Sequence, residues 1–361
     1  MLSLRSCSLL FLILLTSFSG FCQLSSDYKD AIEQSKVLIK EQLQTYPGIS
    51  IAVTIGNEVA WSEGFGLADR EKATPVTDAN TFRLYSLSKT ITGLAVAKLE
   101  EDGKLDLSKN ISFYLPDVPA AYKDVKVYHL VSHTAGVRHY KNNEWLKVSS
   151  KHCDNAADAD DVFINDKLES VPGTKYQYSS FGYVLLSQLL EKAAGVPFRD
   201  YVRENIFKST GVKLYFDKVD PYDNPATFYE AGKKIKVARE IDNSCKFGGG
   251  SINGSAADVA KLFSGVFYSG MIINQASATK TLESFKLDDG TPVNYGYGWQ
   301  RIKSSEGYDI AIHTGSGLGG SSAICFLPEK KLMVVMTTNL DEDDFYKTAI
   351  AIAKKFAPVA Q

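Results

Sequence analysis

Residues 82–107 read FRLYSLSKTITGLAVAKLEEDGKLDL, and they predict a buried helix that opens on Ser86. Apolar residues recur along this segment at the spacing of one helix face: Leu87, Ile91, Leu94, Ala95 and Leu99. Gly103 follows the last of them and can end the helix. The segment therefore places a serine at the N-terminus of a core helix.

Ser86 and Lys89 form a Ser-x-x-Lys pair at this helix start. Residues three apart share one helix face, so the lysine amine can reach the serine hydroxyl. The helix dipole and the free backbone N–H groups there favour developing negative charge. The same spacing occurs twice more, near the N-terminus and in a polar segment: Ser26 to Lys29 and Ser277 to Lys280. The pair alone therefore does not separate a nucleophile from a serine cap beside an exposed lysine.

Two further segments separate these readings. Residues 172–180, PGTKYQYSS, precede an amphipathic helix candidate, and residues 313–317, HTGSG, end an apolar strand. With these three ordered motifs the chain resembles the penicillin-recognising serine hydrolases: class C β-lactamases, D-Ala-D-Ala peptidases, related esterases and D-aminopeptidases. Within that family it is most similar to the mitochondrial serine β-lactamase-like members. The resemblance covers about residues 47–340.

The resemblance implies Ser86 as the acyl-accepting nucleophile, Lys89 as its proton partner and Tyr178 as a second general acid or base. It also implies an oxyanion hole from the backbone N–H groups of Ser86 and Ser316. An alcohol needs a base to take its proton, and a lysine serves only when its pKa lies well below ~10.4. Alternatively, Lys89 stays charged and Tyr178 acts as phenolate. The sequence leaves both assignments open.

Two positions depart from the family pattern. Ser180 stands where an asparagine usually holds the substrate amide, and a hydroxyl offers one donor instead of two. His313 stands where the third motif, completed by Gly315, often begins with lysine. An imidazole of ordinary pKa ~6.5 should make carboxylate recognition looser and pH-dependent. The chain also lacks the Glu-x-x-Leu-Asn motif of class A enzymes.

These departures favour a serine hydrolase that forms an acyl-enzyme at Ser86 on a D-amino-acid-containing peptide amide or a small ester. β-Lactam turnover should be weak or absent. Two alternatives stay open. One is a genuine class C-like β-lactamase, and the other is a non-catalytic binding or filament-forming protein that keeps the fold.

Strand patterns lie at both ends of the chain. Residues 49–69 suggest a hairpin around Gly56-Asn57, and three apolar runs follow near the C-terminus: YDIAIHT, SSAICFL and LMVVMTTN. Helix patterns flank them at 27–46 and 345–357. The expected fold is α+β, an antiparallel sheet from both chain ends, flanked by helices, with a mainly helical region inserted. We expect one domain over 23–361, with an α/β part at about 23–110 and 245–361 and a helical part at about 111–244.

The charge composition limits the classes of binding partner. Lys and Arg total 40 against 42 Asp and Glu, so the chain lacks the basic footprint of nucleic-acid or polybasic membrane-surface binding. A small peptide, ester or β-lactam-like substrate is expected; the sequence does not set the oligomeric state. Residues 1–22 resemble a secretory signal, with Arg5 before an apolar run and cleavage before Gln23. Export to the periplasm or the exterior follows. A lipid anchor on Cys22 is the rival, weakened by the bulky Phe21 before it.

The remaining cysteines and histidines predict neither a metal site nor a cofactor. The odd cysteine count has no CxxC spacing, which favours three buried or free thiols over one disulfide: Cys153, Cys245 and Cys325. Cys325 lies in an apolar run and is expected in the core. Three histidines gather within eleven residues but lack an HExxH frame, so we expect packing and loop support from them: His129, His133 and His139.

Overall fold

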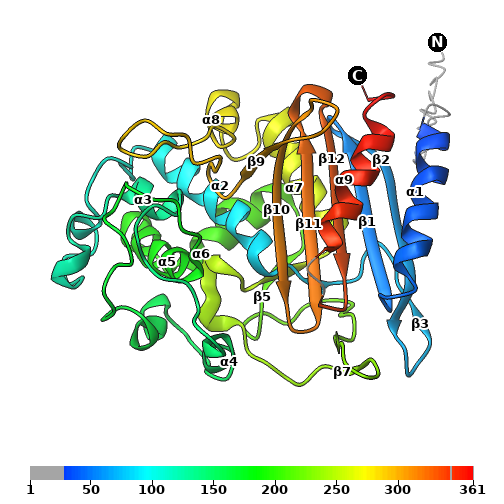
Figure 1. Ribbon diagram of the computed structural model, residues 1–361, viewed down its shortest axis with the longest axis horizontal. Helices are drawn as coiled ribbons and strands as arrows, with labels where there is room; N and C mark the ends of the chain where they lie inside the picture. The colour runs from blue at the N-terminus through cyan, green and yellow to red at the C-terminus, as the bar shows by residue number, and fades with distance from the viewer. Residues whose placement is uncertain (1–27, 342–343, 361) are drawn as a thin grey trace, which may run out of the picture.

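The largest element of the molecule is a seven-stranded antiparallel sheet built from both ends of the chain (Figure 1). The computed structural model describes residues 28–341 and 344–360, so the expected signal peptide at 1–22 lies outside the described residues. In spatial order the strands are β3 (Thr74–Pro75), β2 (Glu58–Asp69), β1 (Gly48–Ile55), β12 (Leu332–Thr338), β11 (Gly320–Leu327), β10 (Asp309–Gly317) and β9 (Gln300–Lys303). The expected α+β fold with a terminal sheet is confirmed.

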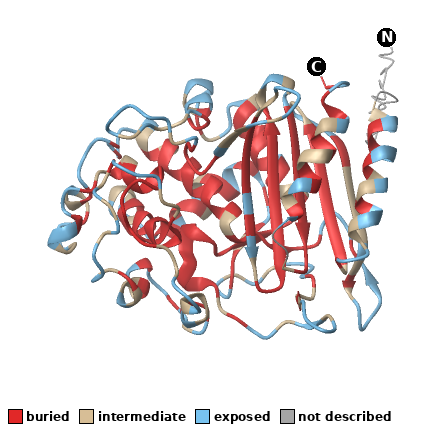
Figure 2. Cartoon of the chain, viewed as in Figure 1, coloured by how far each residue is buried: buried red, intermediate tan, exposed pale blue. Residues whose placement is uncertain are grey.

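Both faces of the central strands β1, β12 and β11 are buried, whereas the edge strands β3 and β9 are not (Figure 2). Successive strand residues point to opposite faces. Along β12, Met333 and Val335 enter the core shared with the helical part, whereas Val334 and Met336 pack under the two terminal helices. Those helices, α1 (Lys29–Gln42) and α9 (Phe345–Phe356), lie against each other on one face, and α7 (Ala256–Ser269) covers the other. The apolar runs expected as strands are therefore uniformly apolar because water reaches neither face.

The first two strands form the expected hairpin. Ile55 pairs with Glu58, and the two residues between them make the turn. Gly56 has a φ of 58°, a left-handed conformation that glycine adopts without steric cost. A Gly-Asn dipeptide between two apolar runs thus identified the turn correctly.

The Ser-x-x-Lys segment forms the central helix α2 (Ser88–Glu101), which lies between the sheet and the helical part (Figure 1). The predicted helix is confirmed, including its buried apolar stripe. The burial extends further than one face, because α5 (Ser180–Ala194) and the turn at residues 244–249 also pack on it. The remaining helices are α3 (Val127–Val131), α4 (Glu144–Val148), α6 (Phe198–Val202) and α8 (Gln275–Lys280). Short strands make two small sheets: β4 (Phe82–Arg83), β8 (Ile252–Gly254) and β5 (Leu214–Phe216), and β6 (Tyr229–Glu230) with β7 (Lys236–Val237).

Two of the cysteines are bonded. Cys153 and Cys245, 92 residues apart, form a disulfide, so the expectation of three thiols is wrong. Cys325 is a free, buried thiol in the core, as expected. Sequence spacing could not show the pairing, because it depends on how the loop after α4 folds back on the segment before β8. Within the described part of the chain, no helix is long and apolar enough to cross a bilayer.

Replacing Cys245 by serine should lower the free energy of unfolding by about 2–4 kcal/mol, because the bridge restricts a long loop of the unfolded chain. Denaturant unfolding under non-reducing conditions measures this. Reductant should destabilise the wild-type protein by a similar amount and leave Cys245→Ser unchanged. A variant as stable as the oxidised wild type would contradict the expectation.

Candidate active site

Ser86 lies in a tight 3₁₀ turn, Tyr85–Leu87, that leads into α2. Its side chain is partly exposed, whereas its neighbour Tyr85 is buried and has a φ of 48°. A bulky residue rarely adopts positive φ, and such strain clusters at functional sites. The Tyr85 hydroxyl donates a 2.5 Å hydrogen bond to the carbonyl of Leu318, which helps to hold the turn. The strained turn presents Ser86 to solvent ahead of a buried helix.

Gly315 brings strand β10 against this turn. A Cβ atom at position 315 would lie 2.0 Å from the Leu84 carbonyl oxygen and 2.9 Å from the Ser86 nitrogen. Only glycine permits that approach, so the contribution of Gly315 is backbone proximity. The next residue, Ser316, lines the same cavity as Ser86, and its hydroxyl donates a 2.6 Å hydrogen bond to Asp341. The oxyanion hole assigned to Ser86 and Ser316 remains a prediction.

Lys89 is fully buried one helical turn beyond Ser86. Its Nζ lies 3.1 Å from Ser86 Oγ, 3.2 Å from Ser180 Oγ and 2.6 Å from the carbonyl oxygen of Gly249. Burial lowers the pKa of Lys89 well below its usual value, and the nearby positive charge of Lys246 lowers it further. The surroundings of this amine favour its neutral form.

Tyr178 approaches Ser86 from the start of the α5 segment. Burial raises the pKa of the Tyr178 phenol above its usual value, and a hydrogen bond with Ser86 offsets part of that rise. Lys89 Nζ lies 4.8 Å from the centre of the Tyr178 ring, and the His133 ring packs 4.4 Å away. The structure thus brings together Ser86, Lys89 and Tyr178, in an environment that favours amine and phenol over ammonium and phenolate.

Ser180 is buried between Lys89 and a histidine. Its hydroxyl accepts a hydrogen bond from Lys89, and its backbone N–H donates to His139 Nδ1 at 3.1 Å. Ser180 also lines the cavity. Besides the substrate contact expected from the sequence, it therefore helps to position the Lys89 amine.

His313 does not act as the sequence suggested. Its ring is 5% exposed; Nδ1 donates to the Thr314 carbonyl at 2.7 Å, and the Tyr295 hydroxyl donates to Nε2 at 3.1 Å. Burial and the proximity of Lys89 lower the pKa of His313 to about 3. A pKa this low favours the neutral ring, and His313 is not among the residues that line the cavity, so the structure disagrees with pH-dependent recognition of a carboxylate by His313.

The three clustered histidines, His129, His133 and His139, support loops, as expected. Each accepts a hydrogen bond from a backbone N–H group at its Nδ1 atom. His129 accepts from Lys126, His133 from Ser179 and His139 from Ser180. Within residues 28–341 and 344–360, no group of three or more His, Cys, Asp or Glu side chains could hold a metal ion.

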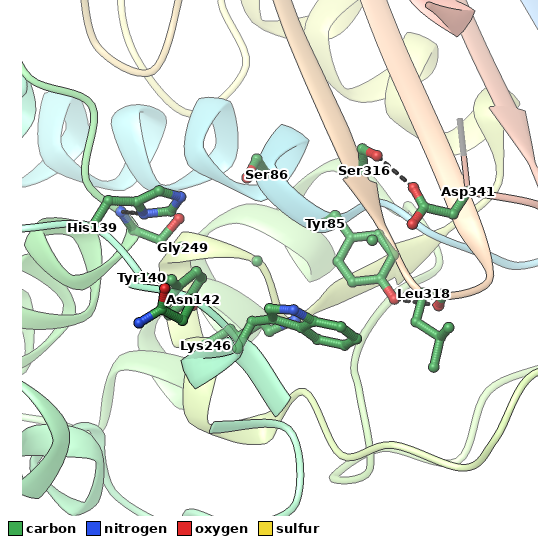
Figure 3. Close-up of a pocket in the computed structure, with 14 residues that line it drawn as sticks. Tyr85, Ser86, His139, Tyr140, Asn142, Lys246, Gly249, Ser316, Leu318 and Asp341 are labelled. Carbon is green, nitrogen blue, oxygen red and sulfur yellow. Dashed lines mark hydrogen bonds between the residues drawn. The ribbon is translucent and has the colours of Figure 1, made fainter. Parts of the chain in front are cut away.

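Ser86 opens into a cavity of about 440 Å³ between the sheet and the helical part (Figure 3). In the close-up, His139 and Gly249 lie on one side of Ser86, and Ser316 and Asp341 on the other. Its lining residues are Tyr85, Ser86, His139, Tyr140, Asn142, Trp145, Ser180, Lys246, Gly249, Gly250, Ser316, Gly317, Leu318 and Asp341. Sequence reasoning missed Lys246 and the Gly249 carbonyl; a lysine beside the glycine run at 248–250 was the available signal.

Comparison with known proteins agrees with this geometry. The β-lactamase family model matches residues 37–356, most of the chain. The chain belongs to the β-lactamase family. It is a serine hydrolase of the group that includes the penicillin-binding proteins, as its sequence motifs suggested.

Curated members of the β-lactamase family share about a quarter of their residues with this chain. Penicillin-binding protein 4* of Bacillus subtilis is 26% identical over 312 residues, 82% of this chain and 68% of the relative. The mitochondrial serine β-lactamase-like protein of Bos taurus is 26% identical over 441 residues, 90% of this chain and 79% of the relative. The resemblance to the mitochondrial members is confirmed.

Solved structures share the fold. D-amino acid amidase from Ochrobactrum anthropi superposes with a TM-score of 0.78 at 20% identity, covering 92% of this chain and 98% of that one. FmtA from Staphylococcus aureus gives 0.78 at 20% identity, covering 92% and 91%. These structures confirm a β-lactamase-type architecture.

Gly315→Ala should slow the labelling of Ser86 by a fluorophosphonate about 100-fold or more, because the added methyl group forces strand β10 away from the Ser86 turn. Activity-based labelling with intact-mass detection measures the rate. Gly232→Ala is the matched control: its Cβ would meet no atom closer than 3.6 Å. Equal labelling rates in both variants would show that the close approach does not matter.

Proposed function

We propose that this chain forms an acyl-enzyme at Ser86, with neutral Lys89 as the base and the phenol of Tyr178 as the acid. The observation that carries this proposal is the 3.1 Å distance from Lys89 Nζ to Ser86 Oγ in a site that disfavours the lysine charge. A neutral amine has two N–H donors, which suit Gly249 and Ser180. Its lone pair is then left for the Ser86 proton.

The acylation step follows from these positions. Ser86 Oγ attacks the substrate carbonyl carbon while its proton passes to Lys89 Nζ. The tetrahedral oxyanion accepts hydrogen bonds from the backbone N–H groups of Ser86 and Ser316. The carbon–nitrogen or carbon–oxygen bond to the leaving group breaks as Tyr178 donates a proton to that atom. Water then attacks the ester of Ser86 and gives a proton to the Tyr178 phenolate. Lys89 returns its proton to Ser86 Oγ, which restores all three groups and releases the acid.

The substrate we propose is a D-amino-acid-containing amide or a small ester. The cavity of about 440 Å³ lies in the size range of small-molecule sites. A structural neighbour is a D-amino acid amidase, which supports this class over a large polymer. β-Lactam turnover should be weak, because Ser180 lacks the amide of an asparagine and the chain has no class A deacylation motif.

We also propose that the protein is exported. The basic and apolar start of the chain supports this, and so does the Cys153–Cys245 disulfide, since such bonds persist mainly in oxidising compartments.

Two substitutions test the acid and base assignments. Lys89→Met should slow acylation by both a p-nitrophenyl ester and a D-alanine anilide by about 10²–10⁴-fold. Tyr178→Phe should slow the anilide similarly but spare the ester, since p-nitrophenolate leaves without a proton. Stopped-flow burst kinetics measure acylation, with thermal unfolding as a check on folding.

A loss of ester acylation in Tyr178→Phe would contradict the assignment of Lys89 as the base. If phenolate is the base, Tyr178→Phe should abolish ester acylation as completely as Lys89→Met. The wild-type kcat/KM should rise with pH as Lys89 loses its proton, below the ordinary lysine value, and fall only where the raised pKa of Tyr178 is reached. If the reaction required ionised Tyr178 instead, kcat/KM would not fall at high pH.

Benzylpenicillin should acylate Ser86 and leave it slowly. We expect steady-state turnover well below the ~10 s⁻¹ typical of enzymes. Mass spectrometry of the intact protein should show a penicilloyl adduct on the wild type and none on Ser86→Ala. Rapid hydrolysis without an accumulating adduct would instead support the β-lactamase alternative.

A further inference from the structure

Lys246 is a buried cation to which no carboxylate of the described residues is directly bonded. Its side chain is 8% exposed and lines the cavity beside Ser86. Within the described residues its ammonium group makes no hydrogen bond or ion pair; its nearest recorded contact is the Tyr85 ring, 4.9 Å from Nζ to the centre. The carboxylates of Asp217 and Asp341 stabilise this charge from a distance, but neither forms an ion pair or a hydrogen bond with the ammonium group.

Three other buried cations of the described residues donate hydrogen bonds from their side chains. Arg83 donates to the Leu318 carbonyl, Arg138 binds Asp166 and Glu144, and Arg199 donates to three backbone carbonyls. A buried charge without such partners costs free energy. Keeping Lys246 in this state makes physical sense if an anion completes its surroundings.

The remaining groups around the cavity leave this role to Lys246. Burial lowers the pKa values of Lys89 and His139, so both favour the neutral form, and Asp341 accepts a hydrogen bond from Ser316. Burial and the nearby Arg83 lower the pKa of Lys246 only to about 8, which leaves it mostly protonated at neutral pH.

Two features fix the position of the Lys246 side chain. Its stem lies beside Gly250, because a Cβ added to Gly250 would lie 3.6 Å from Lys246 Cδ and 3.6 Å from the carbonyl carbon of Tyr85. The preceding residue, Cys245, is held by its disulfide to Cys153. Tyr85 also precedes the nucleophile, so the cation has a defined place relative to Ser86.

We propose that Lys246 binds a carboxylate of the substrate whose carbonyl group reacts with Ser86. This inference rests on the proposed function and narrows its substrate class to amides or esters that carry an anionic group. Lys246 would then supply the charge recognition that His313, neutral and outside the cavity, does not provide.

Matched ester pairs test the proposal. For an acyl-side charge, p-nitrophenyl hemisuccinate is compared with p-nitrophenyl butyrate; for a leaving-group charge, 3-acetoxybenzoate is compared with phenyl acetate. In Lys246→Met, the ratio of kcat/KM for the anionic ester to that for the neutral ester should fall about 10- to 100-fold in one pair, the loss of a charge-assisted hydrogen bond. The affected pair identifies the side that carries the charge.

Two further variants serve as controls. Lys246→Arg keeps the charge and should recover part of the ratio, whereas Lys192→Met removes an exposed lysine elsewhere and should leave it unchanged. Unchanged ratios in both pairs for Lys246→Met would overturn the proposal. If neither ester pair is hydrolysed and a fluorophosphonate does not label Ser86, the proposed function fails instead.

A binding measurement decides the matter without turnover. Calorimetry with Ser86→Ala compares the binding of the two members of each ester pair. In one pair the anionic ester should bind more tightly than the neutral ester, and adding Lys246→Met should remove at least tenfold of that preference. No preference for the anionic ester in either pair, or a preference that survives Lys246→Met, would overturn the proposal.

Discussion

An amine enclosed by protein loses the water that stabilises its charge, and the site of Lys89 depends on this loss. The Nζ atom lies within hydrogen-bond distance of one backbone carbonyl and two hydroxyls, with no carboxylate among its recorded partners in the described chain. A carboxylate there would restore the ammonium form and remove the base. Tyr178 experiences the same burial with the opposite consequence, because its neutral form keeps the proton. One dry environment therefore favours the neutral amine and the neutral phenol that the proposed mechanism requires.

That environment requires three distant segments to meet. Helix α2 supplies Ser86 and Lys89, the segment before α5 supplies Tyr178, and the turn before β8 supplies the Gly249 carbonyl. Glycines permit close approaches around this site: Gly248 fits against Thr92, and Gly315 fits against the backbone of Leu84. The sheet contributes rigidity, since its central strands are buried on both faces and β11 holds β10 in register beside the Ser86 turn.

Local patterns predicted the elements better than the contacts between them. The apolar stripe of α2, the Gly56 turn and the terminal strands were readable because each depends on residues close in sequence. The burial of His313, the Cys153–Cys245 bond and the place of Lys246 were not, because each depends on which remote segment packs against it. His313 illustrates what sequence alone cannot predict. Its residue type suggests titration near neutral pH, but its burial beside Tyr295 lowers its pKa far below that range.

The bridge between Cys153 and Cys245 ends one residue before Lys246 and four before Gly249. The redox conditions of biosynthesis thus bear on the catalytic centre as well as on folding. Protein made in a reducing cytosol would carry two thiols here, and the segment that supplies the Lys89 acceptor would be tethered by non-covalent contacts alone. Kinetic measurements should therefore be made on protein in which this bridge has formed, by oxidative refolding or by secretion.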